Sequence, residues 1–138
     1  MTRNYEMNNF YLLQNKNLLY IHFMGAIESK SLIDDAIFSF SIGDEKTARN
    51  TLLKVLEFDP DNLDALRAIS EVLLSLNELE SSELYCRRAL KNSPKDLTSM
   101  VSLARILVKK GDKEGAEDAS SKARILGWKE ELASEDDD

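Results

Sequence analysis

The sequence contains two proline turns that are separated by 34 residues. Pro60 and Pro94 each follow one apolar stretch and precede another. Proline lacks a backbone N–H and disfavours helical geometry in the residue before it, so each proline is expected to separate two helices. Only two prolines and five glycines occur in the 138 residues, which argues against a turn-rich β fold. The spacing therefore predicts an all-α repeat with a period of 34 residues.

A second break occurs between the prolines, at Gly43, Asn77 and Gly111, which are again 34 residues apart. Gly and Asn tolerate the left-handed conformation that ends many helices. Each unit is therefore predicted to be a helix, a tight turn and a second helix. The units are 29–62, 63–96 and 97–130, and the expected helices are 30–42, 45–57, 63–76, 79–91, 97–110 and 113–126.

Small side chains recur at three positions of the unit, where they would let paired helices cross closely. They are Ala36, Ser70 and Ala104; Ala48, Ser82 and Ala116; and Val55, Ala89 and Ala123. Together with the prolines and turns, this pattern over residues 29–130 resembles the tetratricopeptide repeat family. It departs from the family at Trp128, where the third unit lacks its proline, and at the tyrosine-like position, which holds Ser39, Leu73 and Leu107.

The resemblance implies an α-solenoid of three antiparallel helical hairpins, wound as a right-handed superhelix. Residues 1–28 lie outside the units, and their apolar periodicity predicts an N-terminal capping helix over about 9–26. A β-hairpin that turns at 14–17 is the alternative. The segment is too apolar to stay exposed, so it should cap the first unit, fill the groove or pair with another chain.

At the other end, Trp128 stands where the third unit would have its proline. We expect a short C-terminal cap that begins there and covers the last repeat, because terminal repeats need atypical surfaces. Residues 131–138 are expected to form an acidic disordered tail.

The resemblance further implies that the first helix of each unit lines a concave surface that binds a peptide or a helix. Ile33, Ile37 and Phe40 form an apolar stripe, which we expect the N-terminal segment to cover; Arg67 and Arg105 would suit a carboxylate. The motif that grips acidic C-termini of heat-shock chaperones is absent, since Ile33, Ile37, Ala68, Thr98 and Ser102 occupy its positions. The predicted groove residues are Lys30, Ile33, Ile37, Phe40, Asp64, Arg67, Glu71, Leu74, Val101, Arg105, Val108 and Lys109.

The residues indicate no catalysis, cofactor or metal. His22 is the only histidine, Cys86 is the only cysteine, and neither a phosphate-binding glycine loop nor a metal-ligand spacing occurs. A formal net charge of −7 argues against nucleic acid binding. The longest apolar run, 18–27, is half the length of a membrane-spanning helix, so we expect no membrane insertion and a cytoplasmic location.

We therefore expect a non-catalytic adaptor that binds a protein or peptide partner. The alternative is a small chaperone or assembly subunit, similar to the repeat chaperones of type III secretion, that forms a homodimer through its N-terminal segment.

Overall fold

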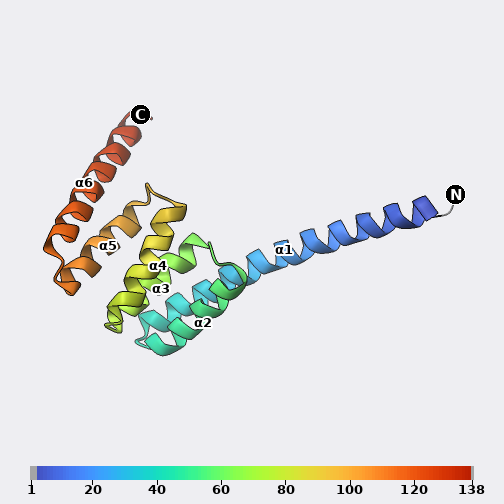
Figure 1. Ribbon diagram of the computed structural model, residues 1–138, viewed down its shortest axis with the longest axis horizontal. Coiled ribbons are helices and arrows are strands. Elements are labelled where there is room, and N and C mark those ends of the chain that lie inside the picture. The colour runs from blue at the N-terminus through green and yellow to red at the C-terminus, as the bar shows by residue number, and fades with distance from the viewer. Residues whose placement is uncertain (1–2, 138) are drawn as a thin grey trace.

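The computed structural model describes the backbone of residues 3–137 and the side chains of residues 23–137, Lys16 and Leu19. Within this range the chain forms helices and no strands. The helices are α1 (Arg3–Ser41), α2 (Glu45–Phe58), α3 (Leu63–Ser75), α4 (Leu79–Asn92), α5 (Leu97–Lys110) and α6 (Lys113–Glu135). They stack in chain order from α2 to α6, and the N-terminal half of α1 extends away from the stack (Figure 1). The predicted α-solenoid of three helical hairpins is confirmed.

The turns inside the hairpins lie where the sequence places them. Gly43, Asn77 and Gly111 have φ angles of 86°, 61° and 80°, in the left-handed region that glycine and asparagine tolerate. Four helices begin at a side chain that accepts a hydrogen bond from a backbone N–H of the first turn. These N-cap residues are Asp44, Asn62, Asp96 and Asp112.

Each helix packs against the next helix in the chain, and the first helices of successive hairpins also touch, α1 with α3 and α3 with α5. The small residues that the sequence singled out are buried at these crossings. In the second hairpin, Ser82 Oγ donates to the Ser70 carbonyl at 2.7 Å and Ser70 Oγ donates to the Ser82 carbonyl at 3.4 Å. A larger side chain at either position would separate α3 from α4.

The N-terminal prediction of a separate capping helix over 9–26 is wrong, and so is the alternative hairpin. Residues 3–41 form one helix that includes the first helix of the first repeat. Between Gly25 and Lys30 the sequence has no proline, and one glycine inside a helix costs only about 1 kcal/mol. Because the upstream half continues straight out of the repeat, it does not fold back as a cap (Figure 1).

The C-terminal cap and the disordered tail are also contradicted. α6 continues without a break to Glu135, and Trp128 is 65% exposed instead of covering the last repeat. The departure from the family proline explains this, because Gly127 and Trp128 leave every backbone donor available to the helix.

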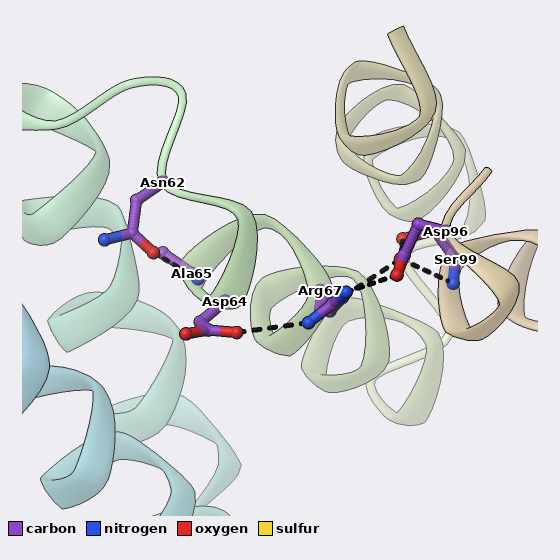
Figure 2. A network of polar contacts seen from close by, with 6 residues as sticks. All are labelled: Asn62, Asp64, Ala65, Arg67, Asp96 and Ser99. Carbon is purple, nitrogen blue, oxygen red and sulfur yellow. Dashed lines mark hydrogen bonds and ion pairs between the residues drawn. The ribbon is translucent and has the colours of Figure 1, made fainter. Parts of the chain in front are cut away.

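α3 is joined to the N-cap of α5 by a charged pair that the sequence did not predict (Figure 2). Arg67 of α3 donates from Nε to Asp96 at 2.9 Å, with a second bond from the guanidinium to the same carboxylate. Asp96 also caps α5 by accepting from the Ser99 backbone N–H at 3.0 Å. The bond from Arg67, opposed by burial and helped by the bonds from Ser99, lowers the pKa of Asp96.

We predict that Asp96 makes stability depend on acid pH. Its pKa is lower in the folded than in the unfolded chain, so its contribution is complete above the ordinary aspartate pKa of about 3.9 and is lost as the pH falls through the folded value. Asp96→Asn should lower the free energy of unfolding by about 2 kcal/mol at pH 7 and reduce the acid slope. Urea denaturation at a series of pH values measures both quantities.

The matched control is Asp64→Asn, since Asp64 contacts the same Arg67 at 3.2 Å but its side chain is 74% exposed. It should change stability by less than about 0.5 kcal/mol. A residual acid slope from Glu83 is expected in both variants, because its bond to Lys110 lowers the pKa of Glu83. Equal effects of the two variants would contradict the prediction.

We also predict that the Cys86 thiol is unreactive in the folded chain. It is buried between the second and third repeats, and Sγ donates to the Ser99 carbonyl at 3.1 Å. Burial raises its pKa from 9.0 to about 11, which lowers the thiolate fraction about a hundred-fold. Labelling by a thiol reagent at pH 7 should therefore follow global unfolding in urea, whereas exposed Ser121→Cys in a Cys86→Ala background should react at once. Equal rates for the two proteins would contradict burial.

Candidate binding groove

A groove of about 540 Å³ lies between α1 and α3. Its floor is apolar and comes from both helices and from α2, and its rim carries charged and polar side chains. The apolar lining residues are Ala26, Ile33, Ala36, Ile37, Phe40, Leu52, Ala68 and Val72, and the polar ones are Lys30, Asp34, Asn62, Asp64, Arg67, Glu71 and Thr98.

The groove brings together seven of the twelve residues predicted to line a binding surface. These are Lys30, Ile33, Ile37, Phe40, Asp64, Arg67 and Glu71. Leu74 is instead 4% exposed and packs in the core between the second and third repeats, because it faces α5. The structure does not bring the α5 residues into this groove; they are Val101, Arg105, Val108 and Lys109.

The apolar stripe of α1 is open on the groove side. Ile37 is 52% exposed, and Ile33 is buried. Phe40 is partly buried against the hydrophobic core that α1, α2 and α3 share. The expected cover by the N-terminal segment is contradicted, because that segment is the straight continuation of the same helix. The stripe therefore offers apolar surface that no described residue covers.

Sequence reasoning missed Asp34, Asn62 and Thr98 as groove residues. Asp34 lies one helical turn after Lys30 and between Ile33 and Ile37, so helical periodicity alone would have placed it near the groove. Asn62 and Thr98 are the N-cap of α3 and the second residue of α5. They reach the groove only because the first helices lie side by side, and no local pattern contains that information.

The two arginines expected to hold a partner's carboxylate are already paired within the chain. Arg67 binds Asp96 and Asp64, as Figure 2 shows. Arg105 Nη1 lies 3.0 and 2.9 Å from the two carboxylate oxygens of Glu71, which also accepts from Ser102 at 2.6 Å. The hydrogen bond that Arg67 donates to Asp96 is the main cause of a raised pKa for Arg67. The interpretation of these arginines as a carboxylate site is therefore corrected.

Among the described side chains no group of three His, Cys, Asp or Glu residues is arranged to hold a metal ion. Within the described part of the chain, no helix combines the length and the apolar character that crossing a membrane requires.

Comparison with solved structures identifies the architecture. An O-GlcNAc transferase mutant from Thermobaculum terrenum matches with a TM-score of 0.71 and 24% identity, over 74% of this chain and 20% of the transferase chain. The second TPR of Spaghetti (RPAP3), bound to the HSP90 peptide SRMEEVD, matches with a TM-score of 0.69 and 15% identity, over 72% of this chain and 92% of that one. MamA gives a TM-score of 0.69 and 16% identity, over 72% and 58%.

In sequence, the Protein CTR9 homolog of Arabidopsis thaliana is 34% identical over 85 residues, which is 62% of this chain and 8% of that relative. The chain thus spans less than a tenth of the curated relative that it matches. No family model matches the sequence. The helical hairpins, their turns and the structural matches agree, and the chain has the fold of the tetratricopeptide repeat proteins, with three repeats.

Proposed function

We propose that the chain is a non-catalytic adaptor that binds a peptide or a helix of a protein partner in the groove between α1 and α3. The observation that carries the proposal is the open apolar stripe, with Ile37 half exposed inside a groove whose rim is polar. An apolar floor with a few polar groups at its edge is the usual composition of a ligand site. The second TPR of Spaghetti, which has the same fold, is bound to a peptide.

The spacing of the stripe suits an elongated occupant. Ile33, Ile37 and Phe40 lie at i, i+4 and i+7 on one face of α1. Ile33 is buried, so Ile37 and Phe40 offer apolar surface to a partner over about one helical turn. A partner would place its own apolar side chains against this face, as helices and extended peptides do in grooves of this kind. Covering the exposed half of Ile37 alone would contribute about 1 kcal/mol.

We predict that Ile37→Glu weakens groove binding strongly while Phe38→Glu does not. Peptides selected from a display library on the wild-type protein are the probes, and fluorescence anisotropy measures their Kd. Glutamate at position 37 puts an unpaired charge against the partner's apolar side chains, so affinity should fall at least about ten-fold. Phe38, which is 64% exposed and lies about 100° further round the helix, does not line the groove and should leave Kd within two-fold.

Circular dichroism would first show that both variants keep their helices. If the selected peptides bind the two variants equally, they occupy another surface and the groove is not the binding site.

A second candidate function is that of a small chaperone-like or assembly subunit that dimerises through α1. Leu19, Phe23 and Ile27 are 70%, 62% and 50% exposed and follow one another at intervals of four residues. This spacing places them along one side of α1. The N-terminal half of α1 extends away from the repeats (Figure 1). A helix without tertiary contacts is only marginally stable in water, so pairing with a second copy would stabilise this segment.

The single buried cysteine suits the reducing cytoplasm in which we place either function.

Sedimentation equilibrium tests this candidate. We predict a mass that rises with protein concentration toward that of a dimer, and a monomer at the same concentrations for the Leu19→Glu/Phe23→Glu variant. Val108→Glu, at a 66% exposed position of α5, is the control and should keep the wild-type mass. A wild-type protein that stays monomeric to millimolar concentration would exclude the candidate.

A further inference from the structure

The charges around the groove are unequally available to a partner. Arg67 and Arg105 are both held by carboxylates of the chain itself, at 2.9 Å from Asp96 and 2.9 Å from Glu71. An incoming acidic group would have to displace a bond that is already formed, and at Asp96 that bond is to a carboxylate only 7% exposed. Neither arginine therefore attracts a negative partner as an isolated cation would.

Carboxylates outnumber cations in this region. The groove residues and the residues that pair with them contain three cations, Lys30, Arg67 and Arg105, and four anions. Glu71 and Asp96 are the two that hold the arginines, which leaves Asp34 and Asp64 near the solvent. Among the described residues, Asp34 has no ion-pair partner within 4.0 Å, and Asp64 has one ion-pair partner, Arg67. The side chain of Asp64 is 74% exposed.

Lys30 is the remaining cation of the lining, and it lies one helical turn before Asp34 on α1. Opposite charges at this spacing neutralise each other in part. After that compensation the carboxylate of Asp64 still leaves the groove with an excess of negative charge.

We propose that the groove selects an apolar segment that carries a lysine or arginine beside its anchoring side chains. This deepens the proposed function and depends on it. The apolar floor would take the anchors, and the basic residue would lie toward Asp34 and Asp64, where the excess negative charge is exposed. A peptide rich in acidic residues meets like charge there and finds no uncommitted arginine to compensate.

Selection from a random peptide display library tests the proposal, with the composition of the selected peptides as the first readout. Lysine and arginine should be enriched next to apolar residues, and aspartate and glutamate depleted. For the best selected peptide, Asp34→Asn/Asp64→Asn should weaken binding about five- to ten-fold and reduce its salt dependence. The peptide SRMEEVD, which has three acidic residues and one arginine, should bind more weakly than the selected peptides by at least the same factor.

The control variant, Glu57→Gln/Glu114→Gln, removes the same number of charges at exposed positions outside the groove. Glu114 stands in the first turn of α6, as Asp64 does in the first turn of α3, so the two substitutions perturb similar helix ends. This variant should bind the selected peptide within two-fold of the wild type.

The outcomes separate this inference from the proposed function. Peptides that need Ile37 but show no basic enrichment, or that bind Asp34→Asn/Asp64→Asn normally, would overturn the charge selectivity and leave groove binding in place. Acidic enrichment would overturn the selectivity as well. Selected peptides that bind Ile37→Glu as well as the wild type would overturn both the charge selectivity and groove binding. A selection that enriches no peptide would do the same.

Discussion

Close crossing of helices at small side chains is the constraint on which the rest of this structure depends. Ser70 and Ser82 show it directly, since each hydroxyl bonds to the other residue's backbone carbonyl across the α3–α4 crossing. The equivalent positions of the other hairpins hold alanines, which are buried as well. The first helices of successive hairpins are also in contact, and the groove lies where α1 meets α3.

The sequence predicts the repeats well because the residues at the helix ends have strong local conformational preferences. Pro60, Pro94 and the left-handed Gly43, Asn77 and Gly111 mark the ends of helices, and the observed bounds of α2 to α5 agree with them to within a residue or two. The two ends of the chain lack such signals. No proline separates Gly25 from Lys30, and Trp128 replaces a proline, so α1 and α6 are longer than expected.

The candidate site could be predicted only in part, for a different physical reason. The apolar stripe of α1 follows from helical periodicity, and it lines the groove as expected. The state of the charged residues depends on pairs between residues far apart in the sequence, such as Arg67 with Asp96 and Arg105 with Glu71, which no local pattern reveals. Two arginines that the sequence suggests could bind a partner's carboxylate are paired with carboxylates of the chain itself. The groove is therefore weakly anionic, whereas the sequence suggested a cationic one.

Most of the side-chain hydrogen bonds between neighbouring repeats are similar in the sequence separation of the residues that they join. These bonds, and the bond from Arg67 to Asp96, link residues 27 to 34 positions apart, which is about one period of the sequence. The bond from Cys86 to Ser99 spans only 13 positions. Loop-closure entropy grows only slowly with loop length, so the entropy cost of forming each of these bonds is similar and modest. Folding of such a chain can nucleate in any hairpin and spread to its neighbours one repeat at a time. Its folding rate should be that of proteins with low contact order. A substitution in one repeat should weaken the contacts of that repeat with its neighbours before it affects the far end of the chain.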